Sequence, residues 1–129
     1  MPDVRILVVD DSAVVRRFLK MLLEQHDTHW KVCEEAVNGR EAVEKFEQAR
    51  PDVVILDFQM PEMTGLEAAR ELKQHSPEVP ILMYTMHTSP YLSREARKIG
   101  IEGTCPKSDI RCVTQAVTSL LNHQNYFRD

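Results

Sequence analysis

Residues 6–18 read ILVVDDSAVVRRF and decide the first unit of the fold. The run Ile6–Val9 is entirely apolar, which is typical of a strand that is covered on both faces. Two carboxylates, Asp10 and Asp11, follow it directly. From Ser12, a favourable helix-capping residue, the apolar side chains recur with the period of an amphipathic helix. The stretch therefore predicts a buried strand and a helix joined by a short acidic turn, and it raises the question of why two like charges stand at the end of a buried strand.

The alternation of short apolar runs with helix-length segments continues along the chain. Strands are predicted at residues 6–9, 32–36, 53–56, 81–84 and 103–105. Helices are predicted after Ser12, Asn38, Thr64 and Ser89, the fourth over about 90–99, with a fifth that starts near Asp109 and buries Ile110, Val113, Ala116, Val117, Leu120 and Leu121. This pattern predicts an α/β fold, a doubly wound parallel sheet of five strands with five helices. The first, third and fourth runs are almost continuous in Val, Ile and Leu, so we expect them in the middle of the sheet.

Composition limits the class of protein. The chain has 129 residues, of which 43% are hydrophobic and 28% are charged, and these values predict one folded domain over residues 1–129. The formal net charge is -4 and no basic cluster is present, so we do not expect this domain to bind nucleic acid directly. No apolar run is long enough to cross a membrane.

The cysteines and the N-terminal residues predict the compartment. Cys33, Cys105 and Cys112 are odd in number and form neither a CxxC pair nor a zinc-binding spacing, so we expect them to be packing residues. The N-terminal residues lack the basic and apolar regions of a secretory signal. We therefore expect a reduced, cytoplasmic protein.

The residues that follow the predicted strands are the candidate site. In an open parallel sheet the carboxyl ends of the strands meet at one rim, and here they carry Asp10 and Asp11, Asp57, Thr85 and Lys107. Three carboxylates at that rim repel one another, each close pair by roughly 4 kcal/mol at an effective dielectric of about 20, so the cluster needs a cation, raised pKa values or both. An oxygen-only site with room for water suits Mg²⁺ or the similar Mn²⁺. A lysine and a threonine hydroxyl suit phosphate oxygens, and the set as a whole predicts phosphoryl transfer to an aspartate.

Four segments in this order and spacing carry a family resemblance. LVVDDS, VVILDFQMPEMTGLEAARELK, ILMYT and GTCPKSD resemble the receiver domain of two-component response regulators, and the match covers nearly the whole chain. The resemblance implies a flavodoxin-like sheet with strand order 2-1-3-4-5. It also implies that Asp57 accepts a phosphoryl group from a phosphohistidine on a sensor histidine kinase or a phosphotransfer protein.

The resemblance also assigns roles around the acceptor. Asp11 would bind Mg²⁺ directly, Asp10 would help through water, and the backbone carbonyl of Gln59 would complete the metal site. Thr85 would bond to the phosphoryl group and Lys107 would pair with it. On this interpretation the protein is not a conventional enzyme, although it is expected to catalyse its own phosphorylation from a phosphodonor and its own dephosphorylation.

Phosphorylation is expected to change a binding surface formed by the fourth helix, fifth strand and fifth helix. A partner protein or a second copy of the receiver would bind there, as in a homodimer. The exposed residues expected on this surface are Tyr91, Arg94, Glu95, Lys98 and Arg111.

Three positions near the site depart from the family pattern or vary within it. Thr104 stands where the family usually has a tyrosine or phenylalanine ring that moves inward on activation, so the coupling would be weaker or would run through another residue such as Tyr84 or Tyr91. Gln59 and His87 are positions that tune the lifetime of the phosphoryl group.

Two further features concern the end of the chain. Proline precedes the lysine in CPKSD, so any question of a cis bond moves to Cys105-Pro106, where trans is the default. The KSD form and the segment LLNHQNYFRD resemble receivers that stand before a helix-turn-helix output domain, which would make this a transcription regulator. On this view residues from about 122 to 129 begin a linker, and a receiver that stands alone is the equal alternative.

Other functions remain open at this stage. A phosphatase of the haloacid dehalogenase type also uses an aspartate nucleophile and Mg²⁺, but it predicts an acid-base aspartate where this chain has Gln59. A nucleotide or flavin module would have a glycine-rich loop after the first strand, and none is present. A binding module with the receiver fold that is never phosphorylated is the last alternative.

Overall fold

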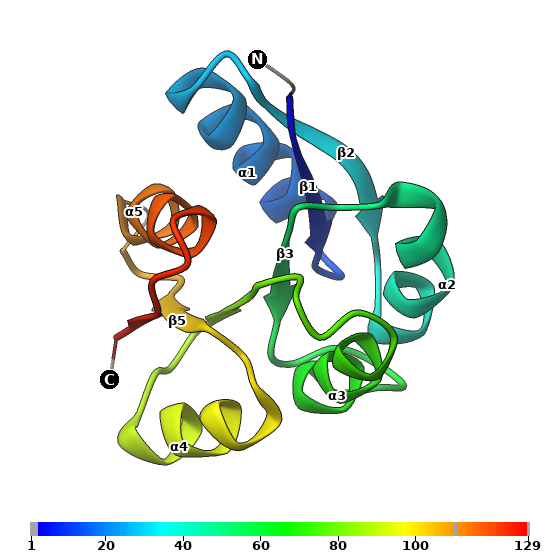
Figure 1. Cartoon of the computed structure of the whole chain (residues 1–129), viewed down its shortest axis with the longest axis vertical. Helices are drawn as coiled ribbons and strands as arrows, with labels where there is room; N and C mark the ends of the chain where they lie inside the picture. The colour runs from blue at the N-terminus through cyan, green and yellow to red at the C-terminus, as the bar shows by residue number, and fades with distance from the viewer. Residues whose placement is uncertain (1–2, 110, 129) are drawn as a thin grey trace.

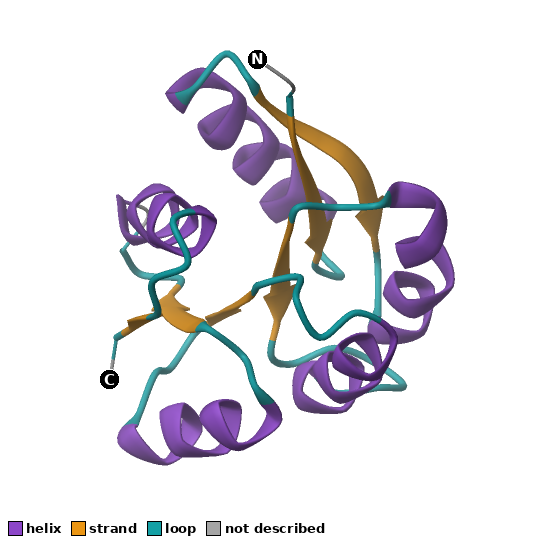
Figure 2. Ribbon diagram, in the orientation of Figure 1, coloured by secondary structure: helices purple, strands orange, loops and turns teal. Residues whose placement is uncertain are grey.

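The computed structural model describes residues 3–109 and 111–128. They form one parallel sheet with helices on both faces (Figures 1 and 2). The elements in chain order are β1 (Val4–Val9), α1 (Ala13–His26), β2 (Trp30–Ala36), α2 (Gly39–Ala49), β3 (Val53–Asp57), α3 (Gly65–His75), β4 (Ile81–Thr85), α4 (Pro90–Ile99), β5 (Gly103–Pro106), α5 (Arg111–Leu121) and β6 (Tyr126–Phe127). The predicted α/β fold with five helices is confirmed.

The sheet has the order β2-β1-β3-β4-β5-β6, and every neighbouring pair is parallel. The predicted flavodoxin-like order 2-1-3-4-5 is therefore correct for the first five strands. β6 is one strand more than predicted, and it pairs with β5 at the edge of the sheet. The chain thus returns to the sheet within the segment that the sequence assigned to a linker.

Two apolar cores explain the continuous apolar runs of the central strands. On one face, alternate strand residues such as Val8, Ile55 and Leu82 are buried under α1 and α5. On the other face, residues such as Val9 and Met83 are buried under α2, α3 and α4. Figure 1 shows α1 and α5 on one side of the sheet and the other three helices on the opposite side. Because both faces are covered, a central strand has no polar face.

The capping residues begin the helices where the sequence predicted. Ser12, Asn38, Thr64 and Ser89 each accept a hydrogen bond from a backbone N–H in the first turn of the following helix. Each cap satisfies a donor that has no partner within the helix. The loops that carry the site residues therefore have fixed ends.

The cysteine prediction is wrong for two of the three residues. Cys105 at β5 and Cys112 in the first turn of α5 are fully buried and form a disulfide, with Cα atoms 6.0 Å apart. The packing of α5 on β5 brings the two side chains within the range that a disulfide needs. Cys33 is a half-buried free thiol, as expected of a packing residue.

Three smaller predictions can be compared directly. The last helix begins at Arg111, and Ile110 lies outside the described residues. The Cys105-Pro106 bond is trans, because the described residues contain no cis peptide bond. Within the described part of the chain, no helix has the length and apolar character needed to span a membrane.

Candidate functional site

The predicted site residues meet at the carboxyl rim of the sheet. Asp10 follows β1, while Asp57 and Thr85 are the last residues of β3 and β4, and Lys107 follows β5. A pocket of about 260 Å³ at this rim is lined by Asp11, Asp57, Gln59, Thr85, Met86 and Lys107. β1 and β3 are neighbours in the sheet although β2 lies between them in the sequence, so Asp10 and Asp57 stand at the point where strand order reverses.

The carboxylates converge on one small volume. Asp10, Asp11 and Asp57 each offer an oxygen, and these oxygens all lie within 4.8 Å of one another. Asp10 is 1% exposed and Asp57 is 5% exposed, whereas Asp11 faces solvent. The Lys107 ammonium joins the two buried carboxylates, with Nζ 2.9 Å from Asp10 Oδ2 and 3.1 Å from Asp57 Oδ1.

Burial and charge shift the pKa values of this group. Burial, and then repulsion by Asp10, raise the pKa of Asp57, and the nearby Lys107 offsets only part of this effect. For Lys107, burial lowers the pKa, but the hydrogen bond to Asp10 and the two carboxylate charges outweigh it, so its pKa lies above the ordinary value. The lysine is therefore charged, and the ionised form of Asp57 is disfavoured until more positive charge reaches it.

The donor set fits a magnesium ion. The converging ligand atoms are carboxylate oxygens, one from an exposed side chain, and the pocket leaves space for water molecules. Mg²⁺ prefers this combination of few carboxylates and several waters. A second cation would also offset the repulsion that one lysine leaves between three carboxylates.

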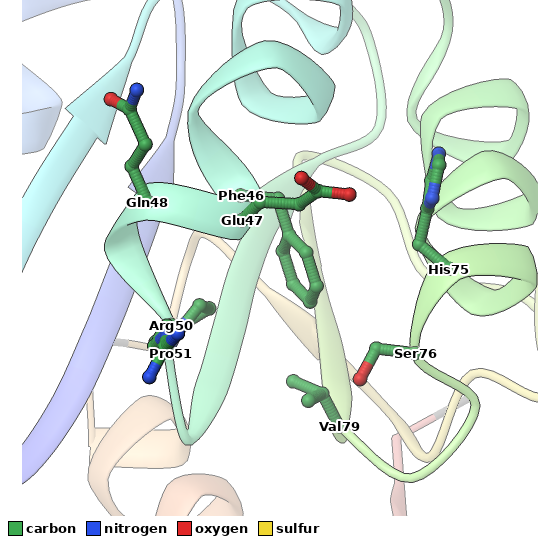
Figure 3. A pocket seen from close by; sticks show the side chains of 8 residues that line it. All are labelled: Phe46, Glu47, Gln48, Arg50, Pro51, His75, Ser76 and Val79. Atoms are coloured by element: carbon green, nitrogen blue, oxygen red, sulfur yellow. The ribbon is translucent and has the colours of Figure 1, made fainter.

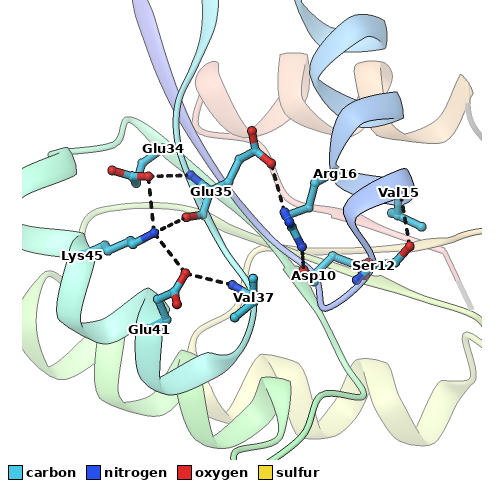
Figure 4. Close-up of polar contacts among 9 residues, drawn as sticks. All are labelled: Asp10, Ser12, Val15, Arg16, Glu34, Glu35, Val37, Glu41 and Lys45. Atoms are coloured by element: carbon cyan, nitrogen blue, oxygen red, sulfur yellow. Dashed lines mark hydrogen bonds and ion pairs between the residues drawn. The ribbon is translucent and has the colours of Figure 1, made fainter.

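The first strand end is held by contacts that the sequence analysis did not find. Asp10 Oδ1 accepts a hydrogen bond of 2.9 Å from the Ser12 N–H. Arg16 Nη1 donates to the Asp10 carbonyl at 2.8 Å, and its Nε donates to Glu35 at 3.0 Å (Figure 4). Lys45 Nζ in turn donates to the Glu35 carbonyl. This network ties α1, β2 and α2 to the backbone of Asp10.

A glycine fixes the loop after Asp57. The Gly65 N–H donates a 2.8 Å hydrogen bond to the Phe58 carbonyl, which brings the start of α3 against the end of β3. A Cβ at position 65 would overlap the Asp57 carbonyl oxygen and lie 2.8 Å from the Phe58 Cα. Only glycine permits this close approach. The Gln59 N–H points back to Asp57 Oδ1 at 3.4 Å.

β4 and β5 are joined at the site. The Lys107 N–H donates to the Thr85 carbonyl at 2.6 Å, and Thr85 is buried with its hydroxyl accepting from the His87 N–H at 3.4 Å. The His87 side chain is exposed, and His87 is not among the described residues that line the pocket. Met86 also lines the pocket, and no sequence pattern indicates it as a site residue.

The three candidates for coupling differ in position. Thr104 is fully buried in β5, and its hydroxyl is hydrogen-bonded to the backbone of Arg128 at 3.2 Å. Tyr84 is buried beneath the site, with its ring centroid 5.7 Å from Lys107 Nζ. Tyr91 is 64% exposed on α4. Of the two tyrosines, Tyr84 is therefore the one with a described contact to a site residue.

The predicted output residues lie at the surface of α4 and α5. Tyr91, Arg94, Lys98 and Arg111 are exposed, while Glu95 is partly buried and pairs with Lys98 at 3.0 Å.

A larger hollow lies at the other end of the sheet (Figure 3). Its volume is about 800 Å³, and it is lined by the ends of α2 and α3 and the residues that precede β3 and β4: Phe46, Glu47, Gln48, Arg50, Pro51, His75, Ser76 and Val79. These residues include one carboxylate and no lysine, so we place the site at the smaller pocket with its convergent charges.

Comparison with known families decides what this arrangement is. The sequence model of the response regulator receiver domain matches residues 6–121. The chain belongs to the response regulator receiver domain family. The predicted two-component receiver is thereby confirmed.

Similar proteins carry the receiver alone or as part of a longer chain. The receiver is 38% identical over 96 residues to the chemotaxis protein CheY of Thermotoga maritima, a match that covers 74% of this chain and 78% of that protein. It is 46% identical over 88 residues to a protein-glutamate methylesterase/protein-glutamine glutaminase of Nocardioides sp., where the match covers 68% of this chain and 24% of the relative. The chain thus spans about a quarter of the methylesterase relatives that it matches.

Solved structures agree. A LuxR-family two-component response regulator of Aurantimonas sp. superimposes with a TM-score of 0.91 at 30% identity, covering 96% of this chain and 89% of that chain. The CheY4 protein of Vibrio cholerae gives a TM-score of 0.80 at 33% identity and covers 94% of this chain and 98% of that chain.

Proposed function

We propose that this receiver accepts a phosphoryl group on Asp57 in a Mg²⁺-dependent reaction and changes its binding surface in response. The observation that carries the proposal is the pairing of one lysine with two buried carboxylates, beside a third, in an open pocket. The carboxylates supply a nucleophile and a metal site, and the lysine supplies a counter-charge for a phosphoryl group.

The donor would be a phosphohistidine on a sensor histidine kinase or phosphotransfer protein. A carboxylate oxygen of Asp57 forms the new O–P bond as the N–P bond of the donor breaks, and the histidine nitrogen keeps that electron pair. Lys107 then pairs with the phosphoryl oxygens and the Thr85 hydroxyl donates a hydrogen bond to one of them. Bound Mg²⁺ would offset negative charge on the same oxygens.

The metal would be held by Asp11, Asp57 and the carbonyl of Gln59, with Asp10 acting through water. Asp10 suits this indirect role because its two oxygens already accept from Ser12 and Lys107. His87 and Gln59 stay predictions as tuning residues, and the link of His87 to the site is its N–H, which donates to the Thr85 hydroxyl.

Beyond its own modification and dephosphorylation we propose no separate substrate. The output would be binding of a partner or of a second copy at α4, β5 and α5, through Tyr91, Arg94, Glu95, Lys98 and Arg111. The single domain over residues 1–129, the linker at 122–129 and the cytoplasmic location also remain predictions. Family membership removes the reason to pursue the phosphatase and nucleotide-module alternatives.

Intact mass tests the proposal. The chain is incubated with acetyl phosphate, with and without Mg²⁺, as wild type, Asp57→Asn and the control Glu62→Gln, which removes an exposed carboxylate from the same loop. We expect a Mg²⁺-dependent gain of one phosphoryl group in the wild type and the control and no gain in Asp57→Asn. No gain in any sample would overturn the proposal and leave a receiver fold that acts as a binding module without phosphorylation.

A further inference from the structure

The last described residues form a strand on the edge of β5. Gly103 pairs with Tyr126 and Thr104 pairs with Phe127 in a parallel register. The Tyr126 N–H donates to the Glu102 carbonyl at 2.9 Å, and the Arg128 N–H donates to the Thr104 carbonyl at 3.2 Å. A Cβ on Gly103 would lie 2.5 Å from the Tyr126 carbonyl oxygen, so β5 has space for this strand only because residue 103 is glycine.

Side chains of the same segment contact α4 and α5, the two helices of the predicted output surface. The Phe127 ring is partly buried against the core under α4, and the Arg97 guanidinium lies 3.8 Å from its centroid. The Tyr126 hydroxyl donates to Gln115 of α5 at 3.0 Å. Residues 126–128, which we call the tail strand, therefore cover β5 between α4 and α5.

Contacts on both sides of Lys107 join the tail strand to the chain. Before the lysine, the Thr104 hydroxyl donates to the Arg128 carbonyl and accepts from the Arg128 N–H, both at 3.2 Å. After the lysine, Asp109 pairs with the Arg128 guanidinium at 3.3 Å. The same residue of the tail strand thus touches both arms of the loop that presents the site lysine.

The position of Lys107 depends on what Asp57 carries. In the unmodified protein its ammonium lies against the Asp57 and Asp10 carboxylates. A phosphoryl group on Asp57 places the anionic oxygens farther from the strand end, and the ammonium follows them. The Lys107 N–H is hydrogen-bonded to the Thr85 carbonyl, and Thr104 and Asp109 lie on either side of the lysine in the chain, so a backbone adjustment at Lys107 would reach both contacts of Arg128.

We propose that the tail strand is a docked segment whose hold on β5 reports the state of Asp57: it is docked when Asp57 is unmodified and released when Asp57 is phosphorylated. The inference rests on the proposed function, and the docking of the tail strand on β5 is the property that phosphorylation of Asp57 changes. Thr104 acts as the positioning residue of this coupling, through a hydroxyl and without a ring. A two-residue strand is held weakly, so a small change at its partners is enough to release it.

Hydrogen exchange in the 129-residue chain tests the proposal. We compare the amides of Tyr126 and Arg128 before and after treatment with acetyl phosphate and Mg²⁺, and the intact mass of the same samples gives the extent of phosphorylation. We expect both amides to exchange at least about tenfold faster in the phosphorylated protein. Asp57→Asn should show slow exchange under both conditions.

Two variants separate coupling from general loosening. Thr104→Val keeps the shape of the side chain but removes its hydrogen bonds to Arg128, and we expect fast tail exchange that no longer changes on phosphorylation. Gly103→Ala should release the tail strand by overlap alone, without any modification. Thr118→Val, an exposed change on α5 that touches neither Arg128 nor Thr104, is the control and should behave as wild type.

The outcomes distinguish the two proposals. If Asp57 takes up no phosphoryl group, the proposed function fails and the coupling falls with it. If Asp57 is phosphorylated and tail exchange stays within about twofold of its starting rate, or if Thr104→Val responds to phosphorylation as wild type does, the coupling proposal alone is overturned.

Discussion

The two ends of the sheet treat charge in opposite ways. At the carboxyl end, three carboxylates converge in an open pocket, and one lysine pairs with two of them. At the other end, Lys73 Nζ lies 2.6 Å from Glu102 and also donates to the carbonyls of Pro77 and Val79, while the second oxygen of Glu102 accepts from the Ile81 N–H. The carboxyl end, which we call the open end, therefore has an excess of negative charge. At the opposite end, which we call the closed end, the charges of Lys73 and Glu102 balance each other.

The closed end contributes to stability, whereas the open end serves function at a cost in stability. The Lys73 side chain is 9% exposed and its charge is matched, so this end can stabilise the fold without further ions. The carboxyl end keeps charges that disfavour the folded state until a cation arrives. The closed end should therefore lose stability when it is altered, and the open end should lose function while stability rises.

The largest expected effect comes from breaking the closed end. Lys73→Met removes the ammonium but keeps a flexible apolar stem, which leaves Glu102 and two carbonyls without their partner. We expect a loss of about 3 kcal/mol in the free energy of unfolding, measured by urea titration, with phosphoryl uptake retained. Lys98→Met is the control, since Lys98 pairs with Glu95 at the surface and should cost less than about 1 kcal/mol. Equal losses in the two variants would contradict the comparison.

An intermediate effect is expected where packing, not charge, supports the open end. In Gly65→Ala the added methyl group overlaps the backbone of Asp57, which should cost about 2 kcal/mol and slow phosphoryl uptake. Gly100→Ala is the matched control, because its backbone has a φ of 97° but no atom lies within 4 Å of an added Cβ. It should lose stability with an unchanged rate of uptake. A normal rate in Gly65→Ala would show that the approach of α3 does not position Asp57.

The smallest effect has the opposite sign. Burial, followed by Asp10, raises the pKa of Asp57, so the folded state holds this proton more tightly than the unfolded chain, and stability falls as pH rises through the raised pKa. Asp57→Asn removes that loss, and we expect a gain of about 1 kcal/mol near neutral pH without Mg²⁺. Mg²⁺ at about ten times its Kd should then stabilise the wild type by about 1.4 kcal/mol and the variant by much less. Thermal unfolding checks both statements, and a destabilised variant would refute them.

The sequence was sufficient to predict the parts of the molecule that depend on local pattern. Continuous apolar runs marked the buried strands, and the residues directly after those runs were brought to one rim by the geometry of a parallel sheet. Asp10, Asp57 and Lys107 could therefore be selected together before any distance was known.

The features that sequence reasoning missed depend on packing between distant segments. Tyr126 and Phe127 form a strand that is too short to show an alternating apolar pattern in the sequence. Their pairing with β5 depends on the space beside Gly103. The Cys105–Cys112 disulfide has a spacing with no signature of its own and arises from how α5 lies on β5. Arg16 lies in α1 and its side chain donates to the Asp10 carbonyl, and no sequence motif predicts this contact.

The docked tail strand also sets how far anything joined behind it can travel. While residues 126–128 lie on β5, a reporter fused after residue 129 starts its tether at the edge of the sheet. Once residues 126–128 are released, the tether gains three residues, or up to about 11 Å of extended chain, while residues 122–124 remain hydrogen-bonded to the end of α5. A change of a few ångströms at Lys107 would then become a change in the volume that the attached group can search.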